Sequence, residues 1–207
     1  MKVLLVNGSP HENGCTARAL KEIASTLAEC GVESEMFHIG TAPIAGCTGC
    51  IACATLHKCR IDDVVNEFVE KAKEFDGFVF GSPVHYASAA GAFTAFMDRA
   101  FYSDKCGHNN NFETKPAAAI VSARRAGTTA ALDQINKYFG ISAMPIITST
   151  YWNMVHGNTP EEVEQDLEGL RTMRNLARNM AWFLKMKEVA DIPAPKYEYK
   201  PRTNFIR

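Results

Sequence analysis

The stretch Lys2-Val3-Leu4-Leu5-Val6, closed by Asn7-Gly8-Ser9-Pro10, decides the fold. A short aliphatic run that ends in a turn is typical of a buried strand. Apolar residues then recur at helical spacing over residues 16–30 and are followed by Gly31, which predicts a helix with a glycine stop. Alternating polar and apolar residues over 33–39 predict a second strand near a sheet edge. The chain therefore opens as strand, helix, strand.

The alternation of strand and helix continues along the chain. Short apolar segments predict further strands, and the segments between them predict helices. The expected strands are 78–80, 116–122 and 145–150, and the expected helices are 62–75, 89–101, 128–139 and 159–185. Five strands that alternate with five helices predict an α/β protein with a doubly wound parallel sheet covered on both faces.

The last residues form a separate segment. From Asp191 onward the chain carries three prolines, which exclude a continuous helix. The same segment carries Tyr197, Tyr199 and Phe205, which are too many aromatic residues for a solvated tail. We therefore expect an extended arm that lies on this subunit or on a neighbouring one, with disorder as the alternative.

Composition and charge limit the possible classes of protein. The 207 residues are enough for one substantial domain, and 46% hydrophobic residues is normal for a globular core. The formal net charge of -1 gives no electrostatic reason to expect nucleic acid or an anionic membrane as a partner. The longest apolar stretches are far shorter than the roughly 20 residues that span a bilayer, and no cleavable apolar segment precedes the first strand. We therefore expect a cytoplasmic protein with no nucleic-acid or membrane partner.

Four of the seven cysteines lie in the loop after the second expected strand. In a reducing compartment such thiols suit a metal or cluster better than disulfides. Two residues lie between successive members of the first three, and the fourth follows six positions later, which matches the compact spacing of iron-sulfur clusters. Zinc also takes four thiolates, but usually from two pairs that a longer stretch separates. We therefore favour a 4Fe-4S cluster, with zinc and free thiols as alternatives; its ligands would be Cys47, Cys50, Cys53 and Cys59.

A ligand is expected beyond the carboxyl ends of the strands, where loops and helix N-termini converge in open parallel sheets. The loop 9–16 after the first strand offers hydroxyls, backbone amides and a helix N-terminus, which suit a phosphate group. It lacks the glycine pattern of dinucleotide sites and the Gly-Lys-Ser/Thr of nucleotide triphosphatases. A mononucleotide such as FMN is therefore the better match, and an ordinary strand-to-helix turn is the alternative.

Two more loops complete this crevice. Residues 81–88 combine a proline bend with an aromatic ring and would flank a flat ring system, and a proline turn with a buried tyrosine is the alternative. Residues 122–129 combine small residues, hydroxyls and two arginines at a helix start. A guanidinium beside the pyrimidine edge of a flavin would favour the reduced, anionic ring. A solvated arginine pair is the alternative.

The three loops and the cysteine loop together resemble the NADPH-dependent FMN reductase branch of the flavodoxin-like superfamily, and most closely its iron-sulfur flavoproteins. The resemblance covers Met1 to about Lys185. It rests on the order and spacing of Gly-Ser-Pro-His-Glu-Asn-Gly-Cys-Thr, the four cysteines followed by Ile61-Asp62-Asp63, Gly-Ser-Pro-Val-His-Tyr and Ser-Ala-Arg-Arg. It implies a flavodoxin-like FMN-binding domain over 1–186, with the cysteine loop 47–59 after its second strand, and a C-terminal arm over 187–207.

The resemblance also implies which residues hold FMN. The phosphate would lie on Ser9, His11, Asn13, Cys15, Thr16 and Ala17. The isoalloxazine would contact Pro83, Val84, Tyr86 and Ala87, and a third wall would consist of Ser122, Arg124, Gly127 and Thr128. His11 stands where the family more often has arginine, which would make the phosphate contact depend on pH. His85 replaces a frequent tyrosine on the stacking surface.

By resemblance, the protein would be an FMN-dependent oxidoreductase whose 4Fe-4S cluster couples one-electron and two-electron transfer, and no side chain need act as a covalent catalyst. Its electron donor would be NAD(P)H or reduced ferredoxin. It would form a homodimer or homotetramer in which the cluster meets a neighbour's flavin; residues 151–157 are expected in that interface or in the core. The alternatives are a cluster-free NAD(P)H-dependent FMN or quinone reductase, a non-enzymatic flavodoxin-like electron carrier and a zinc-stabilised flavin-binding module.

The other cysteines and one histidine have structural interpretations. Cys15 fits a tight phosphate loop as a small residue better than it fits a reactive thiol at a helix N-terminus. Cys30 falls on the buried side of the first helix and is expected in the core, whereas Cys106 is expected as an exposed loop thiol. His57, inside the cysteine loop, is expected to face solvent, with a role beside the cluster as the alternative.

Overall fold

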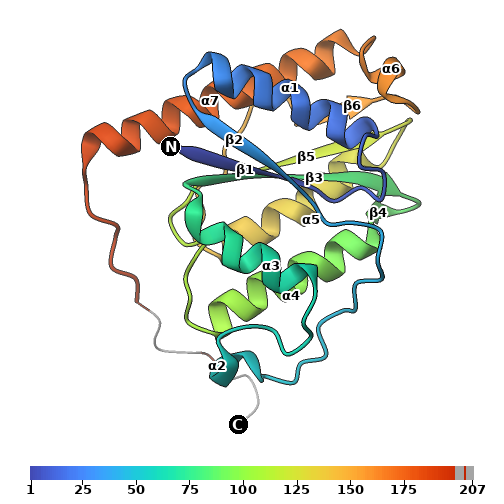
Figure 1. The fold of residues 1–207 in the computed structure, drawn as a ribbon. Helices are drawn as coiled ribbons and strands as arrows, with labels where there is room; N and C mark the ends of the chain where they lie inside the picture. Colours follow the sequence, from blue (N-terminus) through green and yellow to red (C-terminus); the bar gives the residue numbers. More distant parts are fainter. Residues whose placement is uncertain (199–202, 204–207) are drawn as a thin grey trace.

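The computed structural model describes residues 1–198 and 203, and it shows a parallel sheet between two layers of helices (Figure 1). The strands are β1 (Lys2–Asn7), β2 (Glu33–His38), β3 (Gly77–His85), β4 (Ser88–Ala89), β5 (Ala117–Ala123) and β6 (Met154–His156). Their order is β2-β1-β3-β5-β6, and all neighbours in this series are parallel. The two-residue strand β4 pairs with the end of β3 in the antiparallel sense. This confirms the expected α/β doubly wound fold.

Helices fill the connections between the strands. They are α1 (Cys15–Glu29), α2 (Cys53–Leu56), α3 (Val64–Lys71), α4 (Gly91–Cys106), α5 (Thr128–Ile141), α6 (Pro160–Val163) and α7 (Leu167–Ala190), and the 3-10 turn η1 (Ala72–Glu74) follows α3. Figure 1 shows α1 and α7 on one face of the sheet and α3, α4 and α5 on the other. Both faces are therefore covered.

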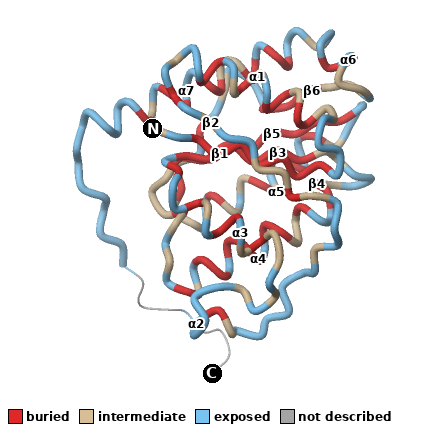
Figure 2. Tube along the Cα trace, viewed as in Figure 1, coloured by how far each residue is buried: buried red, intermediate tan, exposed pale blue. Residues whose placement is uncertain are grey.

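β1 is an interior strand, between β2 and β3, and both of its faces are apolar. Val3 and Leu5 pack into the apolar cluster of the α1 and α7 side, whereas Leu4 and Val6 pack into the cluster of the α3, α4 and α5 side. Successive strand residues point to opposite faces, so a strand that is buried on both faces needs an unbroken aliphatic run. Figure 2 shows the buried residues gathered along the central strands and the inner sides of the helices.

The carboxyl ends of β1, β3 and β5 lie side by side and bring their loops to one edge of the sheet. Gly8, directly after β1, donates its N–H to Gly81 O at 2.8 Å. A side chain at Gly8 would not fit, because an added Cβ would lie 2.2 Å from Phe93 Cδ2. The close contact of the β1 and β3 ends therefore requires a glycine.

The last parallel strand is shorter and begins later than expected. Of the expected strand 145–150, Ile146 makes only an isolated bridge to Ala117, and regular pairing with β5 resumes at β6. Between these points α7 binds the chain, because Asn179 Nδ2 donates to Thr148 O at 2.8 Å. The prediction of a continuous strand was wrong because Ala119 O, the next acceptor on β5, is bound by the side chain of Asn153 at 3.0 Å and not by a backbone N–H of this segment.

The expected helix 159–185 is two helices. Asp166 ends the connection after α6 and caps α7, since its Oδ1 accepts a hydrogen bond from Gly169 N at 2.9 Å. Its Oδ2 accepts one from His156 N at 2.7 Å. The break was missed because Asp166 was not recognised as a helix cap, and its contact with β6 becomes visible only in three dimensions.

The arm begins later than expected, because α7 continues to Ala190 and residues 187–190 are helical. Asp191 follows with a φ of 45°. The chain then runs to residue 198 without regular secondary structure, from the end of α7 toward the end of the molecule where α2 lies (Figure 1). Tyr197 is 40% exposed, whereas Tyr199 and Phe205 lie outside the described residues. A contact between the arm and a neighbouring subunit stays a prediction.

Three smaller differences concern the site. β3 extends through His85 into the loop expected over 81–88, α4 runs past its expected end to Cys106, and the cysteine loop contains the short helix α2.

Over the part of the chain that the structure describes, no helix is long and apolar enough to cross a membrane.

Candidate functional site

A buried asparagine shapes the loop after β1. Asn7 is 0% exposed, and its Nδ2 donates to His11 O at 3.4 Å and to Glu12 O at 3.2 Å. Its Oδ1 accepts a hydrogen bond from Ser9 N at 3.1 Å, and Ser9 Oγ accepts one from His11 N at 3.1 Å. These bonds fix the backbone that leads into α1. This role of Asn7 was not predicted from the sequence, although a polar residue that closes an apolar strand was a usable signal.

The helices that begin at this edge of the sheet differ from the other long helices at their N-termini. Asp63 caps α3 and Asp166 caps α7 with a side-chain hydrogen bond. No described side chain caps α1, α4 or α5, and no acidic residue lies in their first turns. The backbone amides at these three helix starts therefore create a positive potential at the crevice, which favours an anionic ligand.

The residues expected around a phosphate lie at different depths. Ser9, Thr16 and Ala17 are buried, Cys15 is partly buried, and His11 and Asn13 are exposed. The exposed residues line a groove whose other wall is residues 158–160. His38, for which the sequence showed no partner, places its Nε2 2.8 Å from Ser9 O. The expected residues thus lie in one loop, and His38 contacts the backbone of this loop at Ser9.

Cys15 is a packing residue at the start of α1. Its Sγ donates to Gly157 O at 3.5 Å, and burial raises the pKa of the thiol above its ordinary value. A reactive cysteine needs a lowered pKa. The structure therefore supports the interpretation of Cys15 as a small residue in a tight loop.

The loop after β3 turns sharply and exposes a tyrosine. Val84 pairs with Ala89 as the chain folds back from β3 onto β4. Tyr86, at the tip of this turn, has a φ of 59° and is fully exposed. Such backbone is uncommon for a residue other than glycine and is concentrated at functional sites. The exposed ring excludes a buried tyrosine; Pro83 is partly buried and Ala87 is exposed in the same loop.

The loop after β5 contacts the other two loops. Ser122 Oγ lies 2.8 Å from Thr16 Oγ1, which joins it to the loop after β1. Gly127 has a φ of 97°, and an added Cβ would lie 2.9 Å from Val84 Cγ1 in the loop after β3. Glycine alone fits both this conformation and this contact. Of the other expected residues, Thr128 is buried and Arg124 is exposed.

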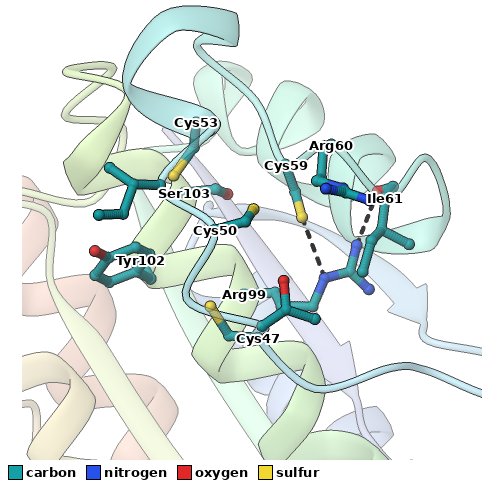
Figure 3. A pocket seen from close by; sticks show the side chains of 11 residues that line it. Cys47, Cys50, Cys53, Cys59, Arg60, Ile61, Arg99, Tyr102 and Ser103 are labelled. Carbon is teal, nitrogen blue, oxygen red and sulfur yellow. Dashed lines mark hydrogen bonds between the residues drawn. The ribbon is translucent and has the colours of Figure 1, made fainter.

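The four loop cysteines surround one pocket on the side of α4 that faces α2 (Figure 3). Its walls include Cys47, Cys50, Cys53 and Cys59 from the loop and Arg99, Tyr102 and Ser103 from α4. Among the described residues, no group of three or more His, Cys, Asp or Glu side chains is arranged to hold a metal ion. The structure therefore brings the four thiols around a common space without gathering them on one point.

The thiols of the pocket differ in their electrostatics. Hydrogen bonds from the backbone of Ala52 and the side chain of Thr48 lower the pKa of the exposed Cys50. Burial, together with a hydrogen bond to Cys106, raises the pKa of Cys53 to about 11. Cys106 ends α4 and is partly buried, so its prediction as an exposed loop thiol was wrong. The pocket therefore contains one thiol with a lowered pKa and one with a raised pKa.

Polar side chains attach the cysteine loop to the neighbouring helices. Asn66 of α3 accepts from Cys59 N at 3.0 Å and donates to Cys59 O at 3.0 Å. His57 Nδ1 lies 2.8 Å from Gly107 O, and Asn109 Nδ2 donates to His57 O at 2.8 Å. His57 is exposed as expected, but it also anchors α2 to the end of α4.

A buried arginine joins the same loop to α4. Arg99 is 1% exposed and makes a forked ion pair with Asp63 at 2.6 and 2.9 Å. Its Nε donates to Cys59 Sγ at 3.3 Å. The role of Arg99 was not predicted from the sequence. The usable signal was an arginine within the apolar stripe of a helix, which must find a charged partner when it is buried.

α4 links the crevice with the cysteine pocket. Directly before α4, Ala90 N donates to Ser82 Oγ at the end of β3 at 3.1 Å, whereas Arg99 and Tyr102 line the cysteine pocket. At 1.5 Å of rise per residue, Arg99 lies about 14 Å along the helix from Ala90. The two candidate sites are separate but share one rigid element.

Comparisons with known proteins agree with this arrangement. A family model described as NADPH-dependent FMN reductase matches residues 1–159. "Iron-sulfur flavoprotein MJ1083" of Methanocaldococcus jannaschii is 31% identical over 191 residues, which cover 90% of this chain and 98% of that protein. An iron-sulfur flavoprotein of Archaeoglobus fulgidus is 27% identical over 201 residues, which cover 88% of this chain and 97% of that protein.

Solved structures share the fold. RosB with bound 8-demethyl-8-formylriboflavin-5'-phosphate superposes with a TM-score of 0.72 at 12% identity, over 100% of this chain and 96% of RosB. A flavodoxin from the domain Archaea superposes with a TM-score of 0.57 at 16% identity, over 89% of this chain and 99% of the flavodoxin. At these identities the likeness shows the flavodoxin-like fold alone. Taken with the sequence relatives, it shows that this chain belongs to the iron-sulfur flavoproteins of the NADPH-dependent FMN reductase family and is a flavin-dependent oxidoreductase.

Proposed function

We propose that this chain holds FMN in the crevice and a 4Fe-4S cluster in the cysteine pocket, and that it couples two-electron to one-electron transfer. The observation that carries the proposal is the ring of four cysteines around one pocket, which α4 joins to the crevice. Bound FMN would exchange electrons in pairs or singly, and a cluster would exchange them singly. The chain itself would supply position, charge and exclusion of water.

The crevice residues fit a flavin mononucleotide. The uncapped start of α1 and the backbone that Asn7 holds in place offer amide donors to a phosphate, and Ser9 and Thr16 add hydroxyls. The loop after β3 would border the ring system with Val84 and Tyr86. The exposed Arg124, after β5, would supply positive charge to the reduced ring.

The pocket fits an iron-sulfur cluster better than zinc. All four candidate ligands are thiols, which both groups accept. A zinc ion draws four sulfurs to about 2.3 Å from one centre, whereas a cluster is larger and its ligands stand further apart. The four thiols line one pocket, and their close spacing in the sequence matches that of cluster ligands, which supports the larger group. A cluster-free reductase is the second candidate, because Cys47 and Cys50 are exposed.

The electron donor and the assembly complete the proposal. NAD(P)H or reduced ferredoxin would deliver electrons, and the protein would act as a homodimer or homotetramer. Support for an interface comes from Tyr151 and Trp152, which are 55% and 56% exposed with ring centroids 4.9 Å apart. Exposed aromatic residues are enriched where proteins associate.

Anaerobic purification followed by flavin, iron, sulfide and zinc analysis tests the proposal. We expect FMN together with about four iron and four sulfide ions per chain, and bleaching of the absorption spectrum by NADPH or by reduced ferredoxin. Flavin without iron would establish the cluster-free reductase, and zinc in place of iron would establish a zinc-stabilised flavin-binding module. A protein that holds both groups but accepts electrons from neither donor would contradict the proposed coupling.

A further inference from the structure

Arg99 ties both ends of the cysteine loop to α4. Its Nη1 donates to Ala45 O at 3.4 Å, two residues before Cys47. Its Nη2 donates to Ile61 O at 2.8 Å, two residues after Cys59. All four candidate ligands lie between these two carbonyls. A single guanidinium therefore closes the loop.

The same guanidinium is held in one orientation. Its side chain is 0% exposed, and Asp63 accepts hydrogen bonds from both Nη1 and Nη2. Asp63 is itself fixed, because its Oδ1 also accepts from Val65 N at 3.1 Å at the start of α3. A forked pair with a carboxylate fixes the plane of an arginine. The remaining N–H, on Nε, is thereby aimed at Cys59 Sγ, as the dashed line in Figure 3 shows.

A hydrogen bond to a ligand sulfur changes the reduction potential of a cluster. Reduction adds negative charge to the cluster and its thiolates, and an N–H donor stabilises that more negative state. The positive charge of Arg99 acts in the same direction. Asp63 opposes it, because its carboxylate lies against the guanidinium at 2.6 Å. The pair therefore leaves a directional donor with little net charge.

We propose that Arg99 is a positioning residue that closes the cysteine loop and, through its bond to Cys59, raises the reduction potential of the cluster. Asp63 limits this rise by offsetting the charge of Arg99. The inference rests on the proposed function, because it names the residue that sets the potential of one of its two centres.

Reduction potentials of three variants test the electronic part of the inference. We expect Arg99→Lys, which keeps the charge but removes the Nε donor, to shift the midpoint potential of the cluster to more negative values. Arg99→Gln, which removes both, is expected to shift it further in the same direction. Asp63→Asn keeps a cap for α3 and leaves Arg99 uncompensated, so its potential is expected to rise. Arg60→Gln, the matched control, removes an exposed arginine from the same pocket and is expected to shift the potential less than Arg99→Gln.

The signs of these shifts decide the electronic part. An unchanged potential in Arg99→Lys would overturn the role of the hydrogen bond, and a fall in Asp63→Asn would overturn the role of Asp63. The iron and sulfide content of the wild-type protein tests the proposed function separately. A wild-type protein without iron and sulfide would contradict the proposed function before any variant is compared.

Hydrogen-deuterium exchange in chelator-treated, metal-free protein tests the positioning part without any cluster. We expect Arg99→Gln to increase exchange across residues 46–60, because both ends of the loop lose their anchor, and Arg60→Gln to leave it unchanged. Equal exchange in Arg99→Gln and wild type would overturn the positioning role, whether or not the wild type binds a cluster. A variant that fails to fold would be recognised by increased exchange in β1, and Arg99→Lys would then replace it.

Discussion

The crevice and the cysteine pocket are built in different ways. Loops that leave three adjacent parallel strands form the crevice, and the sheet register brings them to one edge of the sheet. The cysteine pocket lies on an excursion between β2 and α3, most of which has no helix or strand. Arg99, Asn66 and His57 attach this excursion to α3 and α4. The fold therefore determines the position of the proposed flavin site, whereas the proposed cluster site depends on a few polar contacts.

The largest expected effect separates the two sites completely. We expect Cys50→Ala to abolish the cluster, because one of its four ligands is lost, and to leave the FMN content unchanged, because the crevice uses other loops. Iron analysis and flavin fluorescence of the same preparation measure both. Cys30→Ala, at the far end of α1, is the control and should retain both groups. Simultaneous loss of iron and FMN from Cys50→Ala would show that the two sites form one unit.

The next effect concerns the support of the crevice. Asn7→Ala removes three hydrogen bonds that hold the loop after β1. Each buried backbone group that is left unpaired costs about 1–3 kcal/mol if the loop cannot relax. We expect weaker FMN binding and a lower free energy of unfolding, with the iron content unchanged. Lys137→Ala, at an exposed position of α5, is the control and should change the free energy of unfolding by less than about 0.5 kcal/mol. Unaltered FMN affinity in Asn7→Ala would contradict the role of this residue.

A glycine substitution tests the contact between two crevice loops. Gly127→Ala places a Cβ in a left-handed backbone, at a cost of about 1–2 kcal/mol, and 2.9 Å from Val84 Cγ1. We expect FMN affinity to fall by about tenfold, which corresponds to about 1.4 kcal/mol. Titration of the apoprotein with FMN measures this. Gly140→Ala, on the same helix with no atom within 4 Å of the added Cβ, is the matched control and should bind FMN normally. Equal affinities of the two variants would show that the loop contact does not shape the crevice.

The smallest effect is a pH dependence of the contact between α1 and α7, where Glu22 pairs with Arg174. Burial alone would raise the pKa of Glu22 on α1, but hydrogen bonds from Arg174 and Arg18 outweigh burial and lower it. A carboxyl whose pKa is lower in the folded chain stabilises the fold above its unfolded pKa, and this contribution is lost as the pH falls through the folded pKa. Glu22→Gln should therefore lower the free energy of unfolding by at most about 1 kcal/mol near neutral pH. As the pH falls below 4.5, the ordinary pKa of a glutamate, this difference between the variant and wild type should become smaller. Urea unfolding at several pH values measures it, and a constant difference would contradict this origin.

Much of the fold was predictable because its signals are local. The aliphatic run of β1 and the helical spacing in α1 each depend on neighbouring residues only, so these elements were placed correctly. The unbroken helix over 159–185 was wrong because the cap that Asp166 gives to α7 was overlooked. The strand expected over 145–150 was wrong because Asn153 Nδ2, and not a backbone N–H of that segment, donates to Ala119 O on β5. A local pattern cannot report a hydrogen bond between elements that are distant in the sequence.

The candidate site also has features that the sequence predicted and features that it did not. The positions of the three loops follow from the rule that parallel strands end at one edge, and the cysteine spacing points to a common pocket. The roles of Asn7 and Arg99 were missed because each residue holds a loop of a candidate site through hydrogen bonds, and the partners in these bonds become visible only in three dimensions. The burial of Cys106 beside Cys53 was missed for the same reason.

A crystal structure of the anaerobically purified protein, with diffraction data collected at the iron absorption edge, tests the division into two sites most directly. The account predicts flavin density bordered by the loops after β1, β3 and β5, together with an anomalous iron signal enclosed by Cys47, Cys50, Cys53 and Cys59. Flavin density outside those loops, or a cysteine pocket without an iron signal, would contradict it.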